Sequence, residues 1–269
     1  MGSGIAQLGA TMGFQLTLFD VSEKVLEKSK QMISQNLHVL AEKKKIPFEQ
    51  KQEIFQRIHF TGNLDECVAQ VIIEAIIEQK DAKITLFNNL SKINSEQTIF
   101  ATNTSSLSVS AIANTLINPQ RVVGMHFFNP APLMKLVEVI RGDKTSNEVV
   151  QNIVRLAKRL GKIPVVCNDS PGFIVNRVAR PYYIESLRLI EEGKVSVETI
   201  DALLEATGFK LGPFKLMDLI GNDVNYTVSN SVYEQLGKPE RLLPSFIQKQ
   251  KLDKGELGKK TGKGYYTYS

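Results

Sequence analysis

Short apolar runs alternate with longer segments of helical periodicity up to about residue 168. Runs rich in β-branched residues predict strands at 15–20, 71–76, 98–101, 121–126, 136–140 and 163–167. Apolar residues at helical spacing predict helices at 23–45, 80–93 and 146–160, a short helix after Ser108, and a first helix ending near Gly13. Strands that alternate with helices are typical of βαβ units. The pattern therefore predicts an α/β domain over residues 1–168, built on a doubly wound Rossmann-type sheet.

The pattern changes after Ser170-Pro171-Gly172. Helical periodicity runs through 174–192, 196–207, 213–220 and 223–237, and no convincing strand separates these segments. We therefore expect an all-helical second domain over residues 169–269, closed by a loop rich in Gly and Lys from Gly255 onward.

The first residues carry part of a dinucleotide-binding pattern. Met1 and Gly2 precede a predicted helix, and small residues there let backbone N–H groups approach a phosphate. Asp20 ends the next strand, where dinucleotide folds place the acid that binds the adenosine ribose. These three residues are thus candidate cofactor-binding residues, and an acid at position 20 favours NAD over NADP because it repels a 2′-phosphate.

The glycine pattern is incomplete, because a G-x-G-x-x-G loop has a strand and two glycines ahead of the point where this chain starts. We expect this first strand, normally the central one, to be missing. The strands at 15–20 and 71–75 would then expose unpaired edges, and the chain would be less stable and bind NADH weakly.

Composition narrows the function classes. With 269 residues, 42% hydrophobic and 23% charged, the chain is an ordinary globular protein of one or two domains. Cys67 and Cys167 lack the spacing of metal or redox motifs, so we predict no metal site and a reducing, cytoplasmic compartment. No apolar stretch is long enough for a bilayer, and no secretory signal is visible. The net charge is +5, but without a basic stripe and interleaved aromatics it does not favour nucleic acid.

His126 is the candidate acid/base, because it ends a predicted strand at the edge where open α/β sheets bind their ligands. Imidazole groups exchange protons near neutral pH. Glu138 lies on the next predicted strand, beyond a turn that contains proline, and the chain can double back there. The carboxylate would then fix the imidazole tautomer and stabilise the imidazolium. The spacing alone fits a purely structural pair of His126 and Glu138 equally well. His38 and His59 have no comparable position at a predicted strand end opposite a carboxylate.

Several longer motifs resemble the L-3-hydroxyacyl-CoA dehydrogenases, and at this length the chain is most similar to the bacterial 3-hydroxybutyryl-CoA dehydrogenases. The motifs are Ala101-Thr-Asn-Thr-Ser-Ser-Leu107, His126-Phe-Phe-Asn-Pro130, Met134-Lys-Leu-Val-Glu-Val139, Ser170-Pro-Gly-Phe-Ile-Val-Asn-Arg177, Gly212-Pro-Phe214 and Thr261-Gly-Lys-Gly-Tyr-Tyr266. The resemblance covers essentially the whole chain. It implies an NAD-dependent enzyme that interconverts (S)-3-hydroxyacyl-CoA and 3-oxoacyl-CoA, and a homodimer formed through the helical domain.

The resemblance also implies roles for individual residues of the catalytic centre. His126 and Glu138 would form an acid/base dyad, and Ser105 would hydrogen-bond the substrate hydroxyl near the nicotinamide. Asn176 would face the substrate from the helical domain, so that the site lies between the domains. From the residues alone, Ser105 is more typical of a turn or cap, and Asn176 of a solvated helix position.

Further contacts are implied for the two large ligands. Glu78, Lys83, Ser105 and Asn129 would contact NAD, whereas Asn36 and Lys43 would face the CoA moiety. Asn36 and Lys43 belong to the long helix expected at 23–45, where Lys43 is also part of a solvated lysine cluster.

Two alternatives stay open. The chain could be a related NAD dehydrogenase for 3-hydroxyadipyl-CoA or a sugar acid, and a basic residue reserved for a distal carboxylate would distinguish it. The incomplete start would also fit a truncated, non-catalytic chain of the same fold.

Overall fold

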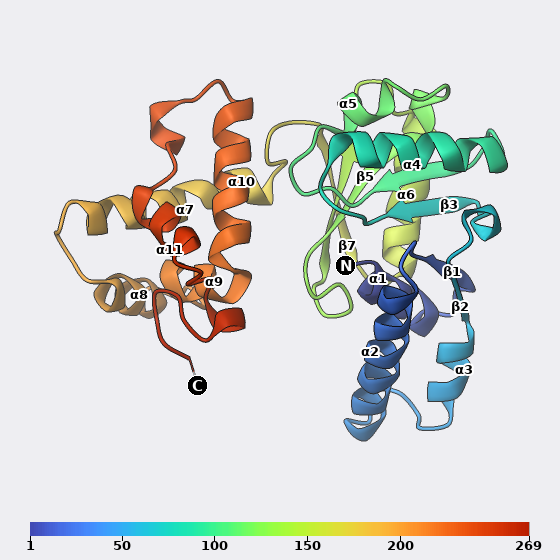
Figure 1. Cartoon of the computed structure of the whole chain (residues 1–269), viewed down its shortest axis with the longest axis horizontal. Coiled ribbons are helices and arrows are strands. Elements are labelled where there is room, and N and C mark those ends of the chain that lie inside the picture. Colours follow the sequence, from blue (N-terminus) through green and yellow to red (C-terminus); the bar gives the residue numbers. More distant parts are fainter. Residues whose placement is uncertain (269) are drawn as a thin grey trace. The chain divides into compact units, whose positions relative to one another are not determined.

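The computed structural model of the chain describes residues 1–268 (Figure 1). The chain divides into two compact units, Met1–Asp169 and the residues from Ser170 onward, within one residue of the boundary expected from the sequence. Each unit has its own core. Among residues 1–268, none of the helices combines the length and apolar composition that crossing a bilayer requires.

The first unit alternates helices and strands, and several helices begin at a serine. The hydroxyl oxygens of Ser22, Ser108 and Ser146 accept hydrogen bonds from backbone amides three residues later, which satisfies one orphan donor of each helix start. The elements are α1 (Gly2–Thr11), β1 (Leu16–Phe19), α2 (Glu23–Glu42), α3 (Gln50–Gln56), β2 (Ile58–Thr61), β3 (Val71–Glu74), α4 (Lys80–Ile93), β4 (Ile99–Thr102), α5 (Val109–Ala113), β5 (Val122–Phe127), β6 (Leu136–Arg141), α6 (Asn147–Arg159) and β7 (Ile163–Asn168).

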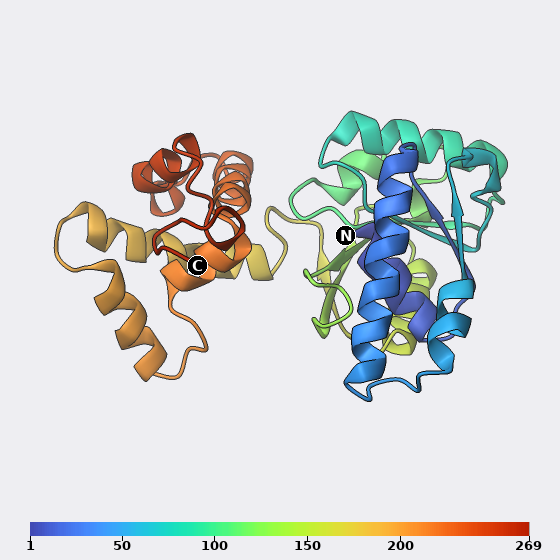
Figure 2. The ribbon, with the colours of Figure 1, turned by 60° about the horizontal axis from the view of Figure 1, so that its bottom comes forward.

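The strands form a two-stranded parallel sheet, β1-β2, and a five-stranded sheet in the order β3-β4-β5-β6-β7. All pairs of the larger sheet are parallel except β5 with β6. Apolar side chains of α1 and α6 pack with the strands in one buried cluster. On the other face lie α4 and α5, where Phe87 of α4 contacts Phe100 of β4 (Figures 1 and 2). The arrangement is a Rossmann-like α/β layer structure, as predicted.

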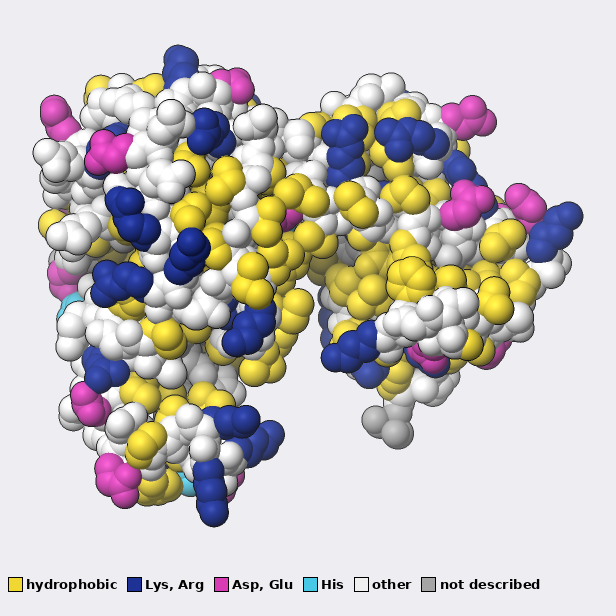
Figure 3. Space-filling view, turned by 180° about the vertical axis from the view of Figure 1, so that it is seen from behind, with side chains coloured by type: hydrophobic (Ala, Val, Ile, Leu, Met, Phe, Trp, Pro, Cys, Tyr) yellow, Lys and Arg dark blue, Asp and Glu magenta, His cyan; other side chains and the backbone are white. Residues whose placement is uncertain are grey.

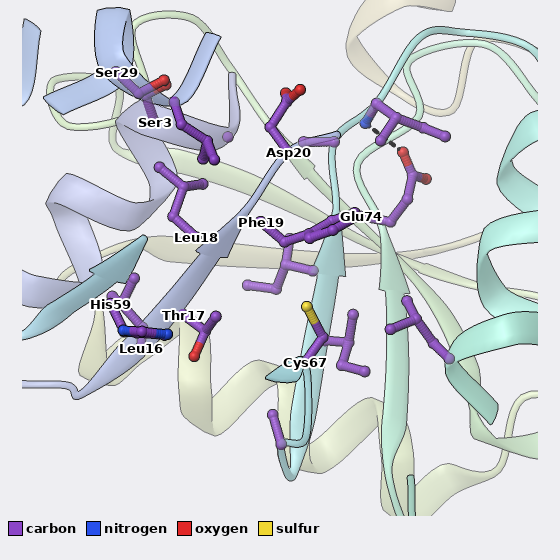
Figure 4. A pocket seen from close by; sticks show the side chains of 18 of the residues that line it. Ser3, Leu16, Thr17, Leu18, Phe19, Asp20, Ser29, His59, Cys67 and Glu74 are labelled. Carbon is purple, nitrogen blue, oxygen red and sulfur yellow. Dashed lines mark hydrogen bonds between the residues drawn. The ribbon is translucent and has the colours of Figure 1, made fainter. Parts of the chain in front are cut away.

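The interruption between the two sheets lies where the missing strand was expected. Among residues 1–268, β1 pairs only with β2 and β3 only with β4. A cavity of about 600 Å³ is lined by residues of both β1 and β3, including Leu16, Leu18, Ile72 and Ile73. Figure 4 shows that the two strands flank this cavity, which therefore has largely apolar walls and two strand edges without a partner.

The second unit is helical, with α7 (Val175–Glu191), α8 (Val197–Ala206), α9 (Pro213–Ile220), α10 (Asn222–Gln235) and α11 (Phe246–Asp253). Two buried carboxylates secure its closing segment. Asp218 accepts hydrogen bonds from the backbone amides of Tyr265 and Tyr266, at 3.0 Å each, and Asp201 accepts one from the Tyr266 hydroxyl at 2.8 Å. The segment passes so closely that a Cβ on Gly264 would lie 2.0 Å from the Asp218 carboxylate.

Several local predictions differ from the structure. The apolar pattern did not predict α3, β2 and α11, which are short elements of 7, 4 and 8 residues. The helix expected to continue to residue 45 ends at Glu42, with Lys43 at its C-cap. The strand expected to reach residue 76 ends at Glu74, because the Glu74 carboxylate accepts a hydrogen bond from the amide of Ile76 at 2.7 Å and turns the chain.

Candidate active site

The imidazole of His126 and the carboxylate of Glu138 lie in contact inside the first unit. The antiparallel register of β5 and β6 places the two residues directly opposite each other. Nδ1 of His126 lies 2.7 Å from Oε2 of Glu138, and their side chains are only 7% and 1% exposed. At this distance Nδ1–H donates to the carboxylate, so the tautomer that carries its proton on Nδ1 is favoured. The doubling back that the proline-containing turn suggested is therefore present.

The segment between these strands is held by its surroundings. The amide of Phe127 donates to Oδ1 of Asn103 at 2.8 Å, which ties the end of β5 to the segment after β4. Lys162 Nζ donates to the carbonyl oxygens of Ala131 and Met134, at 2.6 and 2.8 Å. Burial and the neighbouring charge of Lys135 lower the pKa of Lys162. These contacts fix the turn that returns the chain toward Glu138.

Ser105 lies in a loop gathered around one carboxylate. Oε1 of Glu78 accepts hydrogen bonds from the amides of Ser105 and Ser106, at 2.8 and 3.1 Å, and from the Thr104 hydroxyl at 2.5 Å. Burial raises the pKa of Glu78, but the Thr104 hydrogen bond, the charge of Lys83 and the Ser105 amide outweigh it, so the pKa is lowered overall. Glu78 therefore stays ionised and orders the Ser105 loop.

Lys83 belongs to a buried ion pair that the sequence analysis missed. Its ammonium lies 2.7 Å from Oε1 of Glu74 and 3.3 Å from Oε2 of Glu78, and its side chain is 1% exposed. The second oxygen of Glu74 accepts a hydrogen bond from the Thr102 hydroxyl at 2.8 Å. The signal in the sequence was a carboxylate at the end of an otherwise apolar strand. Glu74, Lys83 and Glu78 thus form one chain of contacts that leads to the Ser105 loop.

Met1, Gly2 and Asp20 line the same cavity between β1 and β3, and Figure 4 labels Asp20 among the lining residues. The helix α1 begins at Gly2, and the first amides of any α-helix lack intrahelical acceptors, which suits a phosphate. The carboxylate of Asp20 follows β1 and accepts a hydrogen bond from the Ser22 amide at 2.9 Å, so the side chain is held at the strand end. A helix start and a fixed acid on one cavity wall fit a dinucleotide.

The remaining candidate residues belong to several different elements. Asn36 and Lys43 are exposed on or beside α2, and the amide of Asn36 donates to the Gln7 side chain of α1 at 3.0 Å. Asn129 is exposed and precedes Pro130 in a cis peptide bond. Asn176 belongs to α7 of the second unit, where it is half-buried.

Comparison with known proteins assigns both units. Residues 1–170 match the family model described as 3-hydroxyacyl-CoA dehydrogenase, NAD binding domain, and residues 172–268 match the corresponding C-terminal domain. The chain belongs to the 3-hydroxyacyl-CoA dehydrogenase family. The resemblance noted in the sequence motifs is therefore confirmed, as are the Rossmann-like and helical fold classes and the assignment of NAD as cofactor.

Individual relatives of the dehydrogenase family are similar along the whole chain. A 3-hydroxyadipyl-CoA dehydrogenase of Escherichia coli K12 is 43% identical over 270 residues, covering 100% of this chain and 57% of the relative. The mitochondrial hydroxyacyl-coenzyme A dehydrogenase of Sus scrofa is 40% identical over 276 residues, covering 100% of this chain and 88% of the relative. The chain thus spans little more than half the length of the first relative.

Solved structures of the family agree with the fold. A 3-hydroxybutyryl-CoA dehydrogenase from Escherichia coli K12 matches with a TM-score of 0.96 at 43% identity, covering 100% of this chain and 57% of that one. An (S)-3-hydroxybutyryl-CoA dehydrogenase from Ralstonia eutropha matches with a TM-score of 0.95 at 35% identity, covering 100% of this chain and 95% of that one.

Proposed function

We propose that this chain interconverts (S)-3-hydroxyacyl-CoA, in particular 3-hydroxybutyryl-CoA, and 3-oxoacyl-CoA with NAD. The observation that carries the proposal is the buried His126–Glu138 contact, at 2.7 Å, in a chain of the 3-hydroxyacyl-CoA dehydrogenase family. Oxidation of a secondary alcohol needs a group that accepts the hydroxyl proton, and an imidazole oriented by a carboxylate is suited to this task.

In the oxidative direction, Nε2 of His126 accepts the proton of the substrate hydroxyl, and it returns the proton in the reverse direction. Glu138 holds Nδ1–H and stabilises the imidazolium that forms. Bound NAD supplies the acceptor for the hydride that leaves the hydroxyl-bearing carbon. Ser105 donates a hydrogen bond to the substrate oxygen, and Asn176 orients the acyl group.

The cofactor is held by residues at one edge of the first unit. The helix start at Met1 and Gly2 faces the pyrophosphate, and Asp20 binds the adenosine ribose. Glu78 and Lys83 act on the nicotinamide side, since both are tied into the Ser105 loop. Asn129 completes this set, and the exposed Asn36 and Lys43 of the first unit contact CoA.

A direct assay tests the proposal. The chain is mixed with acetoacetyl-CoA and NADH, the loss of NADH absorbance is followed, and His126→Ala is measured beside the parent protein. We expect turnover by the parent and a loss of several orders of magnitude in His126→Ala, because the proton donor is removed. A folded, NADH-binding chain that does not turn over any 3-oxoacyl-CoA contradicts the proposal.

We further propose that the protein is a homodimer through its helical unit and acts in the cytoplasm. The helical unit exposes large apolar side chains, among them Val178, Leu203, Leu219 and Phe246, and Figure 3 shows hydrophobic side chains gathered on its surface. Such exposure is typical of an interaction surface. Both cysteines are free thiols, which fits a reducing compartment. Light scattering gives the oligomeric state, and a monomer at working concentration contradicts the dimer.

The second candidate substrate is a dicarboxylic acyl-CoA. The relative from Escherichia coli that is 43% identical is a 3-hydroxyadipyl-CoA dehydrogenase. This chemistry requires a cation for the distal carboxylate.

A further inference from the structure

Arg180 is a buried guanidinium in α7 whose contacts are all with neutral groups. The residue is 3% exposed. Nε donates to the carbonyl oxygen of Asn176 at 2.9 Å, and Nη1 donates to the carbonyl oxygen of Asn225 at 3.0 Å and to Oγ of Ser229 at 2.9 Å. No Asp or Glu among residues 1–268 forms an ion pair with it. A buried charge without a counter-charge is costly, so the site is suited to an anion.

Nδ2 of Asn225, a buried donor beside Arg180, has no acceptor within residues 1–268. The amide of Asn225 is oriented by Gln248, whose Nε2 donates to Asn225 Oδ1 at 2.9 Å. The side chains of Arg180 and Asn225 are neighbours, because Nη1 of Arg180 also lies 3.5 Å from Oδ1 of Asn225. A carboxylate is an acceptor with two oxygens, and it can satisfy a guanidinium N–H and an amide N–H together.

The guanidinium is held in place without any ligand. Its carbon lies 4.9 Å from the centre of the Tyr183 ring, and the contacts to Asn176, Asn225 and Ser229 fix its plane. Burial lowers the pKa of Arg180 to about 10, which still leaves it charged at neutral pH. A cation that is fixed in advance binds an anion without first losing side-chain entropy.

The position of Arg180 relates it to the acyl group. Asn176, which the proposed function places on the substrate, precedes Arg180 by four residues of the same helix, a rise of about 6 Å. The terminal carboxylate of a six-carbon dicarboxylic chain lies a comparable distance beyond the hydroxyl-bearing carbon. We propose that Arg180 and Asn225 bind the terminal carboxylate of a dicarboxylic 3-hydroxyacyl-CoA, an inference that rests on the function proposed above.

The test measures substrate preference with the full chain and NADH. The value of kcat/KM is determined for 3-oxoadipyl-CoA and for 3-oxohexanoyl-CoA, which differ in the terminal carboxylate. We expect the parent protein to prefer the dicarboxylic substrate, and Arg180→Met to lower the ratio of the two values about 100-fold, because the carboxylate loses its charged donor. Arg188→Met, which changes a partly exposed arginine of the same helix, is the matched control and should keep the ratio.

A second variant distinguishes loss of the carboxylate site from loss of folding. Asn225→Asp conserves the side-chain shape and supplies an internal carboxylate to Arg180, so we expect a higher Tm together with loss of the dicarboxylic preference. Turnover of 3-oxohexanoyl-CoA with an unchanged ratio in both variants, or a parent that favours 3-oxohexanoyl-CoA, overturns the carboxylate site but not the proposed function. Turnover of neither substrate by the folded parent overturns the proposed function and this inference with it.

Discussion

Replacing Glu138 by Gln tests the central pair of residues with almost no change in shape. The amide can still occupy the space of the carboxylate and accept a hydrogen bond from His126 Nδ1, at the observed 2.7 Å. The substitution removes only the negative charge that faces the imidazole. Because the Glu138 side chain is 1% exposed, water cannot replace that charge.

The size of the effect follows from the separation of the charges. An imidazolium and a carboxylate in hydrogen-bond contact have charge centres roughly 4 Å apart, which corresponds to ~4 kcal/mol at an effective dielectric constant of about 20. This stabilisation acts only when His126 carries the substrate proton. Its loss should therefore lower kcat by about a thousandfold. KM for NADH should change little, because neither side chain is proposed to contact the cofactor.

The assay follows NADH oxidation with acetoacetyl-CoA in the parent protein and in Glu138→Gln. Glu148→Gln, which changes an exposed acid in the first turn of α6, serves as the control for removal of one negative charge. Circular dichroism and thermal melting establish that the variants fold. A kcat within about tenfold of the parent refutes the electrostatic argument and leaves Glu138 a structural role.

Four further outcomes are expected. Asp20→Ala should weaken NADH binding and relax the discrimination against NADPH, and an unchanged preference in titrations of both cofactors removes Asp20 from the ribose site. An apolar strand of about 5–6 residues followed by Gly-x-Gly, fused ahead of Met1, should raise Tm and NADH affinity because it can pair with both β1 and β3. If a polar extension at the same place raises Tm and NADH affinity equally, this expectation is wrong. Asp218→Ala should lower the free energy of unfolding, measured in urea, by about 3–5 kcal/mol, because it leaves the backbone amides of Tyr265 and Tyr266 without their acceptor. A loss no larger than that of the exposed Asp253→Ala contradicts the role of Asp218 in securing the closing segment. Folding lowers the pKa of Glu78, so the ionised carboxylate stabilises the protein fully above its ordinary pKa of 4.5, and this stabilisation is lost as the pH falls through the lowered pKa. The Tm difference between the parent and Glu78→Gln should therefore shrink in acid, and a difference that does not change with pH contradicts this.

The sequence predicted the elements that have a long or strongly patterned signal. The helices at 80–93 and 213–220 have the bounds expected from their apolar spacing, and the boundary between the units falls within one residue. The contact of His126 with Glu138 was also foreseeable, because strand period and a short turn determine which residues lie opposite each other.

Other features depend on partners that are distant in sequence. The strand Ile58–Thr61 carries too few residues for a periodic signal, and its existence depends on pairing with β1. The buried pair of Glu74 and Lys83 joins a strand end to the first turn of the next helix. Nothing in the composition distinguishes that lysine from a solvated one, so its burial emerges only from the packing of α4 on the sheet.

The direction of β6 has a consequence for how His126 and Glu138 come into contact. If β6 were parallel to β5, its first residues would lie at the opposite end of the sheet from the carboxyl end of β5. Because β6 is antiparallel, it starts beside the carboxyl end of β5, and Glu138 lies directly opposite His126. The two residues are only 12 positions apart, so closing the loop between them costs little chain entropy. The pair is thus local in sequence, and a single hairpin grafted onto another sheet would carry both residues of the proposed acid/base dyad.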